Sequence, residues 1–199
     1  VAEDKKIVLY APTFRNDGKD VEGKNTNRSG LNQLEELKFD ELFSALNKRF
    51  GGEWVMICRF HYHISKNIDW EKLNSEYGGK IINGNKLDDM AEYLPLSDAL
   101  ISDYSSCLHD FALTKKPCFI YAPDIVNYGT KERGFYIPLE ELPYPLAKDS
   151  EELVNNVLDF NSERYERDVD DFMEKIGSKD DGNASARVVD FIVEKIKSV

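Results

Sequence analysis

Five short runs of apolar residues recur along the chain, and segments with helical periodicity separate them. The runs are strand-sized and lie at 6–10, 54–58, 80–82, 99–102 and 118–121. Continuous apolar runs of this length are typical of strands buried on both faces of a parallel sheet. Between them, apolar residues recur at helical spacing, as in 39–50, where Gly51 and Gly52 mark the end of the helix. The pattern predicts an α/β fold with a Rossmann-like, doubly wound parallel sheet.

The rest of the 199-residue chain fits around this sheet as one domain, 1–199. Residues 16–33 are rich in Asn, Asp, Gly, Lys and Ser, which predicts a long mobile surface loop. An irregular stretch is expected from 124 to about 145. Apolar residues at helical spacing between 150 and 199 predict three additional C-terminal helices.

The charge balance limits the kinds of partner that the chain can bind. Its 26 basic and 37 acidic residues give a net charge of −11. Binding of nucleic acid through bulk charge is therefore excluded, and an anionic ligand needs a local cluster of basic groups. No apolar run approaches the roughly 18–20 residues that span a bilayer. The three cysteines fit no metal-ligand spacing, and we expect buried, reduced thiols in a cytoplasmic protein without a metal site.

Polar residues follow four of the predicted strands. In doubly wound folds, ligands bind beyond the carboxyl ends of the strands. This rule predicts that four segments line one crevice: 13–15, 59–63, 103–106 and 122–133.

The turn after the fourth strand carries the clearest chemistry. Ser105 and Ser106 open a predicted helix that runs to about Thr114, and hydroxyls at such a position can bind phosphate. No glycine-rich nucleotide fingerprint is present. An ordinary capped helix explains the same residues, so the alternative stays open.

Basic residues in the other segments suit an anionic ligand. Strand alternation predicts that Arg59 and His61 share one side, where they could bind a diphosphate. Arg15 and Arg133 could each hold an anion, or each could form a surface ion pair. Asp124 could accept a ribose or acceptor hydroxyl, or cap a turn.

Two further possibilities are disfavoured. His109 and Asp110 are adjacent in a predicted helix, so their side chains point about 100° apart and make a poor metal site. No GxSxG motif supports a serine nucleophile. We therefore expect Asp110 to be structural.

Taken together, several short motifs resemble one family. They occur in order as YAPTFR at 10–15, RFH at 59–61, SDALISDYSS at 97–106, KP at 116–117, YAPD at 121–124, RGFY at 133–136 and DGNASARV at 181–188. The combination resembles the C-terminal domain of the CDP-glycerol glycerophosphotransferases, which make teichoic acids and related cell-surface polymers. The resemblance covers essentially the whole chain.

The resemblance implies the donor-binding, C-terminal half of a GT-B fold. It implies transfer of glycerol phosphate from CDP-glycerol to the hydroxyl of a polymer or lipid-linked acceptor, with release of CMP. His61 would be the catalytic histidine, supported by Arg59. Residues that would bind the donor and its phosphates are Thr13, Arg15, Asp103, Ser105, Ser106, Asp124 and Arg133.

No cofactor is implied besides the donor substrate. The family's N-terminal domain, which would supply the general base and the acceptor and membrane surface, is expected to be missing from this chain. The fragment alone is then expected to be inactive, and the full-length protein to work at the inner face of the cell membrane.

Two departures from the family's pattern are present, and several choices stay open. Pro143-Tyr144-Pro145 stands where the family often has Pro-Gly-Pro, and 107–110 is less apolar than is common there. The choice between glycerol and ribitol, or between primase and polymerase, is not fixed. The alternatives are the donor-binding half of a GT-B glycosyltransferase that uses a sugar nucleotide, and a non-catalytic nucleotide-binding domain.

Overall fold

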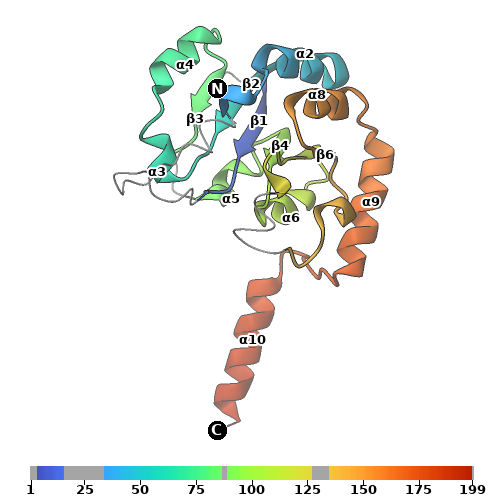
Figure 1. Cartoon of the computed structure of the whole chain (residues 1–199). Coiled ribbons are helices and arrows are strands. Elements are labelled where there is room, and N and C mark those ends of the chain that lie inside the picture. Colours follow the sequence, from blue (N-terminus) through green and yellow to red (C-terminus); the bar gives the residue numbers. More distant parts are fainter. Residues whose placement is uncertain (1–3, 16–33, 87–88, 127–134, 199) are drawn as a thin grey trace. The chain divides into compact units, whose positions relative to one another are not determined.

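The computed structural model describes residues 4–15, 34–86, 89–126 and 135–198. Its centre is a six-stranded sheet in the order β3-β2-β1-β4-β5-β6 (Figure 1), and every paired neighbour is parallel. The strands are β1 (Lys5–Ala11), β2 (Glu53–Cys58), β3 (Ile81–Asn83), β4 (Ala99–Ser102), β5 (Cys118–Tyr121) and β6 (Leu146–Ala147). This order is that of a Rossmann fold, which confirms the predicted class.

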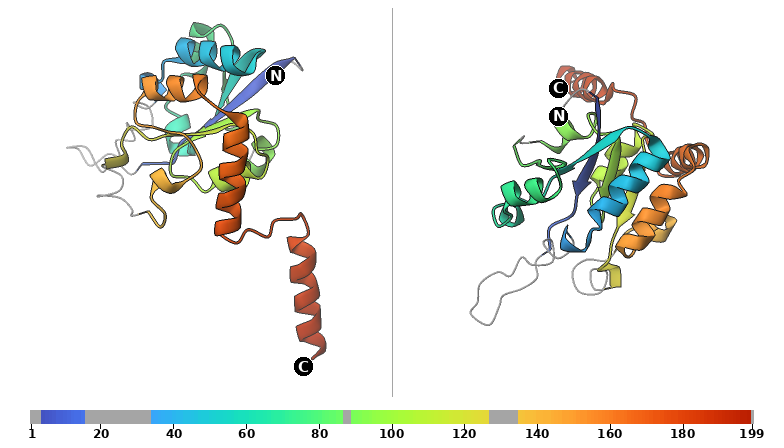
Figure 2. Two further views of the ribbon diagram at one scale, coloured as in Figure 1. Left: turned by 90° about the vertical axis from the view of Figure 1, so that its right-hand side faces the viewer. Right: turned by 90° about the horizontal axis from the view of Figure 1, so that it is seen from above.

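The strands consist of apolar residues because both faces of the sheet are covered. All four residues of β4 and all four of β5 are buried. Helices α2 (Phe39–Phe50) and α8 (Ser150–Leu158) lie side by side on one face, whereas α6 (Cys107–Ala112) lies on the other (Figure 2). The sheet is therefore the middle layer of three, as right-handed crossovers require.

Helix α2 shows how the sequence determines these elements. Its buried side chains, spaced three and four apart, are Phe39, Leu42, Phe43, Ala45 and Leu46. Acidic residues occupy its first turn and basic residues its last, which matches the helix dipole. It ends at Gly51, which has a φ of 70° and donates its N–H to the carbonyl of Asn47.

The remaining helices are short up to residue 141 and longer after it. They are α3 (Tyr62–Ser65), α4 (Trp70–Glu76), α5 (Met90–Tyr93), the 3-10 helix η1 (Leu139–Glu141), α9 (Ser162–Lys175) and α10 (Ala184–Lys197). The chain divides into two compact units, Val1–Val169 and Asp170–Val199. The first unit holds the sheet, and the second holds α10.

Three local differences from the expected elements have physical reasons. Strand β6 comes directly after the predicted irregular stretch, where no strand was expected, because its two residues are too few for a periodic signal. Helix α3 has only four residues and begins shortly after β2, so it too is invisible to periodicity. Helix α6 ends at Ala112 rather than near Thr114, because Lys115 adopts a positive φ of 56° just beyond it. The predicted loop at 16–33 lies outside the described residues.

The central strands should carry most of the stability of the first unit. Leu100 of β4 is fully buried, whereas Leu96 is 62% exposed just before the strand. We expect Leu100→Ala to lower the free energy of unfolding by about 2–5 kcal/mol, because it leaves a cavity. Leu96→Ala is the matched control and should change it by less than about 0.5 kcal/mol. Urea denaturation measures both, and equal losses would contradict this account of the core.

Candidate functional site

The strand order reverses between β1 and β4, and their carboxyl ends meet at the centre of the sheet. Ala11 pairs with Ser102 at this edge, and the Ser102 hydroxyl donates to the Ala11 carbonyl at 2.6 Å. The segments that follow, 12–15 and 103–106, are thereby brought together. The switch point of a doubly wound sheet is the usual place for a ligand.

A buried cluster of charges joins the ends of three strands here. Arg15 is only 2% exposed. Its Nη2 donates to Asp103 at 2.7 Å and to Asp124 at 3.1 Å, its Nε donates to Asp124 at 2.7 Å, and its Nη1 donates to the Thr13 carbonyl at 2.6 Å. Arg15 follows β1, Asp103 follows β4 and Asp124 follows β5. One guanidinium therefore fixes the relative positions of three loops.

The carboxylate of Asp103 extends this cluster to the backbone. Its Oδ1 accepts the N–H of Thr13 at 2.8 Å and the N–H of Tyr104 at 2.6 Å. It is fully buried, so these bonds replace its lost hydration. The turn that leads to Ser105 is consequently held against the end of β1.

Tyr104, which follows β4, is the last member of the cluster. Its hydroxyl donates to Asp124 at 2.9 Å, and its ring lies 4.6 Å from the Arg15 guanidinium carbon. Burial alone would raise the pKa of Asp124, but the bonds from Arg15 and Tyr104 outweigh burial and lower that pKa below its ordinary value of 3.8. Asp124 is therefore a carboxylate at neutral pH. Nothing in the sequence pattern indicated this role for Tyr104.

This cluster changes how two of the predicted residues are understood. Arg15 was expected to hold an anionic ligand, but its guanidinium is buried against two carboxylates of the protein itself. Thr13 also has its hydroxyl oxygen buried, without a partner among the described residues. Binding of the donor by Arg15, Thr13 and Asp124 stays a prediction, and the contacts assign Arg15 a positioning role.

An open cavity of about 360 Å³, here called the His61 cavity, lies beside the cluster. It draws on residues from the ends of four strands, which are Ala11, Pro12, Phe14, Arg59, Phe60, His61, Tyr62, Asn85, Met90 and Ser105. The structure thus brings together Arg59, His61 and Ser105, three of the predicted residues, in one cavity. Asn85, which follows β3, was not among the candidates.

Backbone and aromatic contacts orient His61, which lies beyond the end of β2 and not in the extended strand from which its orientation was predicted. Strand β2 ends at Cys58, and His61 caps the N-terminus of α3. Its Nδ1 accepts the backbone N–H of His63 at 3.4 Å, an arrangement that leaves the proton of a neutral ring on Nε2. Its ring centroid lies 4.6 Å from that of Phe14 and 5.2 Å from that of His63. The imidazole is exposed but oriented.

Arg59 and Asn85 form the wall of the cavity near β3. The Arg59 guanidinium lies 5.8 Å from the centre of the Tyr93 ring, and its Nη1 donates to the Gly84 carbonyl at a long 3.5 Å. Asn85 binds the backbone of Phe60, donating to its carbonyl at 2.6 Å and accepting its N–H at 3.3 Å. Asn85 therefore fixes the segment that carries Arg59 and His61.

The serine turn lies where the cavity meets β4. Ser105 is partly buried, and its hydroxyl accepts the N–H of Cys107 at 3.3 Å. Ser106 occupies the N-cap position of α6 without a capping bond from its side chain. With six residues, α6 contributes only a weak dipole, so the hydroxyls carry most of any phosphate contact.

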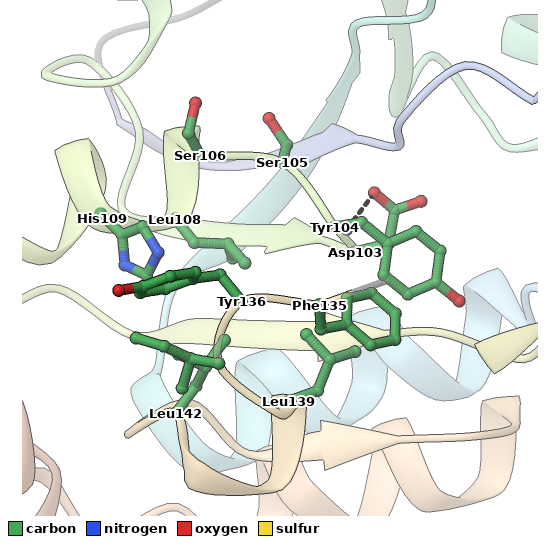
Figure 3. A pocket seen from close by; sticks show the side chains of 11 residues that line it. Asp103, Tyr104, Ser105, Ser106, Leu108, His109, Phe135, Tyr136, Leu139 and Leu142 are labelled. Carbon is green, nitrogen blue, oxygen red and sulfur yellow. Dashed lines mark hydrogen bonds between the residues drawn. The ribbon is translucent and has the colours of Figure 1, made fainter. Parts of the chain in front are cut away.

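A second cavity of about 340 Å³ lies on the other flank of the serine turn (Figure 3). We call it the Tyr136 cavity. Phe135 and Tyr136 face Leu108 and His109 of α6 across it. His109 Nδ1 lies 3.1 Å from the Tyr144 hydroxyl, and burial lowers the pKa of His109 below its ordinary value of 6.5 although Asp110 opposes this effect. The ring is therefore neutral at pH 7.

The other predictions have plain outcomes. Arg133 lies outside the described residues. Cys58, Cys107 and Cys118 are buried free thiols, as expected. The described part of the chain contains no cluster of side chains suited to a metal ion. Among those same residues, no helix is both long and apolar enough to cross a membrane.

Comparison with known proteins identifies the family of this chain. The sequence profile of the CDP-glycerol:poly(glycerophosphate) glycerophosphotransferases matches residues 1–194. This chain belongs to that family. A teichoic acid poly(glycerol phosphate) polymerase of Staphylococcus epidermidis is 36% identical over 98% of this chain and 25% of the relative. A teichoic acid glycerol-phosphate transferase of Staphylococcus aureus is 32% identical over 93% of this chain and 44% of the relative.

The solved structures agree with this assignment to the glycerophosphotransferase family. A structure of the wall teichoic acid polymerase TagF matches with a TM-score of 0.73 and 30% identity, over 98% of this chain and 45% of TagF. A putative UDP-N-acetylglucosamine 2-epimerase from Listeria monocytogenes, with a TM-score of 0.53 and 16% identity, shares the fold. The chain thus spans between a quarter and a half of these glycerophosphotransferase relatives.

The buried cluster should dominate the stability of the site. We expect Arg15→Met to lower the free energy of unfolding by about 3–5 kcal/mol, because Asp103 would stay buried without a cation. Arg164→Met removes an exposed pair with Asp168, whose nearest atoms are 3.5 Å apart, and should change little. Chemical denaturation compares the two variants. An Arg15 variant as stable as the wild type would contradict the role given to the cluster.

His109 should make stability depend on pH in a defined direction. Its pKa is lowered in the folded state, so the unfolded chain binds its proton more readily. The contribution of His109 is then complete above pH 6.5 and is lost as the pH falls through its lower folded value. We expect His109→Gln to reduce the loss of stability between about pH 7 and 5, as measured by urea denaturation at each pH. An unchanged slope would contradict the neutral, half-buried ring.

Proposed function

We propose that this chain is the donor-binding half of a glycerophosphotransferase that binds CDP-glycerol and transfers glycerol phosphate to an acceptor hydroxyl. The observation that carries the proposal is the convergence of Arg59, His61 and Ser105 on one cavity at the switch point of the sheet. Membership of the family and the likeness to TagF support it. A TagF variant has also been soaked with CDPG.

In the proposed reaction, an oxygen of the acceptor attacks the β-phosphorus of CDP-glycerol. A bond forms between that oxygen and phosphorus, and the bond from the β-phosphorus to the bridging oxygen breaks to release CMP. The proton of the acceptor hydroxyl goes to a general base. Most catalysis of phosphoryl transfer is positioning and stabilisation of charge, which these side chains can provide without forming covalent bonds to the substrate.

The residues have distinct proposed roles. His61, with its proton on Nε2, donates a hydrogen bond to an oxygen of the diphosphate or the leaving CMP, and Arg59 adds positive charge beside it. Ser105 and Ser106 donate hydroxyl hydrogen bonds to the same phosphates. Asp103 and Arg15 position the serine turn, Thr13 and Asp124 are proposed contacts of the donor, and Arg133 would neutralise charge on the donor. No metal or other cofactor takes part in the proposal.

The general base and much of the acceptor-binding surface are assigned to a further, N-terminal domain. Among the described residues, Asp124 has a lowered pKa and three hydrogen bonds, so it is a poor base. The chain covers 45% or less of the relatives named above. We therefore propose that the chain alone binds the donor without turnover. In the full-length protein, the acceptor is a polymer or lipid-linked hydroxyl at the inner face of the membrane.

A thermal-shift titration tests the donor assignment. CDP-glycerol and CDP should raise the melting temperature, because a ligand of the native state stabilises it by mass action, and UDP-sugars should not. His61→Ala should weaken binding of CDP-glycerol about ten- to hundredfold, since a hydrogen bond to a charged group contributes about 1.5–3 kcal/mol.

His63→Ala is the matched control, because His63 stacks on His61 but does not line the cavity. It should retain most of the binding. Stabilisation by UDP-sugars alone would overturn the proposal in favour of a glycosyltransferase. The absence of any shift with millimolar cytidine nucleotides would overturn donor binding by this half of the protein.

A further inference from the structure

The Tyr136 cavity has a different character from the His61 cavity, although both include Ser105. None of its described lining residues is lysine or arginine. Its described lining also includes the buried Asp103, and His109, whose ring is neutral at pH 7. A phosphate would meet no cation among these described residues, so this lining favours an uncharged group.

The walls combine rings, aliphatic side chains and a few polar groups. The rings of Tyr104 and Phe135 lie 5.4 Å apart, and Leu108, Leu139 and Leu142 close the opposite side and the base. Tyr136 is fully exposed at the rim, where its phenol can exchange hydrogen bonds. A mostly apolar pocket with a few placed polar groups suits a small neutral ligand that carries hydroxyls.

The position of the cavity connects it to the donor site. The hydroxyls of Ser105 and Ser106 point away from Phe135 and Tyr136 (Figure 3), so a phosphate on the serines lies across the turn from the rings. Because Ser105 lines both cavities, a group esterified to a phosphate at Ser105 can pass beside this residue into the Tyr136 cavity. The cavity is thus within reach of a substituent of the bound phosphate.

We propose that the Tyr136 cavity binds a neutral polyol group next to the phosphates held at Ser105 and Ser106. The proposal rests on the proposed function and extends it, since that function provides two sources of such a group. One is the glycerol of the donor, and the other is the terminal glycerol unit of the acceptor. Tyr136 and His109 provide hydrogen bonds to its hydroxyls, and the rings pack against its C–H groups.

The nucleoside fits the other cavity better. Enzymes read a pyrimidine base by hydrogen bonds to its polar edge, for which carboxamide and guanidinium groups are well suited. Asn85 lines the His61 cavity and keeps one N–H and one oxygen lone pair beyond its two bonds to Phe60, whereas the described lining of the Tyr136 cavity offers neither a carboxamide nor a guanidinium. The polyol is therefore assigned to the Tyr136 cavity, and a nucleoside found there would contradict the assignment.

The experiment is calorimetric titration of the 199-residue chain with three probes. These are CDP-glycerol, CDP, and glycerol 3-phosphate added to CDP-saturated protein. Tyr136→Ala removes the exposed phenol, and Leu142→Trp narrows the cavity. Leu96→Ala is the control, since Leu96 is an exposed residue that lines neither cavity. Melting curves of the unliganded variants verify that each one folds.

Two outcomes support the proposal and distinguish the sources. If the donor supplies the polyol, both cavity variants bind CDP-glycerol about three- to tenfold more weakly and bind CDP as the wild type does. If the acceptor supplies it, CDP-glycerol binding is unchanged, and glycerol 3-phosphate binds the CDP-saturated variants more weakly.

Two other outcomes overturn it. Weaker binding of CDP itself would place the nucleoside in the cavity. Unchanged binding of all three probes would show that the cavity holds none of these groups. A wild-type chain that binds no cytidine compound would instead overturn the proposed function, on which this proposal rests. These failures are distinguishable because the wild type is titrated first.

Discussion

The buried guanidinium of Arg15 is the interaction on which the rest of the site depends. It binds Asp103 and Asp124 at 2.7 Å, and these carboxylates follow two different strands of the sheet. Loops at the edge of a parallel sheet are otherwise free to vary, because the strands fix only their starting points. A buried ion pair adds little net stability, but it favours one arrangement of the loops, because burying either charge without its partner would strongly destabilise the protein. The geometry of the serine turn therefore follows from one arginine.

This use of Arg15 has an electrostatic consequence. One cation faces two carboxylates in the cluster, and the chain as a whole carries a net charge of −11. Binding of the proposed diphosphate would therefore depend on groups outside the cluster, and among the described residues these are Arg59, His61 and the serine hydroxyls of the turn. These contacts act over hydrogen-bond distances, where a negatively charged protein can still hold an anion. The charged groups that hold the loops in position are thus different from the groups that can contact the ligand.

The sequence predicted the fold well because its signals were strong and local. The five apolar runs determined the strands, and the rule for carboxyl ends of parallel strands brought Arg59, His61 and Ser105 together. It could not reveal that Arg15 turns inward, because a loop arginine has the same pattern whether it meets a ligand or a carboxylate. Tyr104 and Asn85 were missed for a similar reason, because their roles depend on partners distant in sequence. Tyr104 bonds to Asp124, 20 positions away, and Asn85 bonds to Phe60, 25 positions away. Strand β6, two residues long, left no periodicity to read.

The two cavities on either side of Ser105 suggest why transfer needs more than this chain. A donor that spans the serine turn would present its β-phosphorus close to Ser105, with His61 on one flank. The described side chains there can donate hydrogen bonds and neutralise charge, but Asp124 is held as a hydrogen-bonded carboxylate of lowered pKa. Activation of an acceptor hydroxyl requires a base with a pKa nearer the working pH. On the proposed function, the site binds and polarises the donor, and the group that accepts the proton would approach from the open side of the His61 cavity.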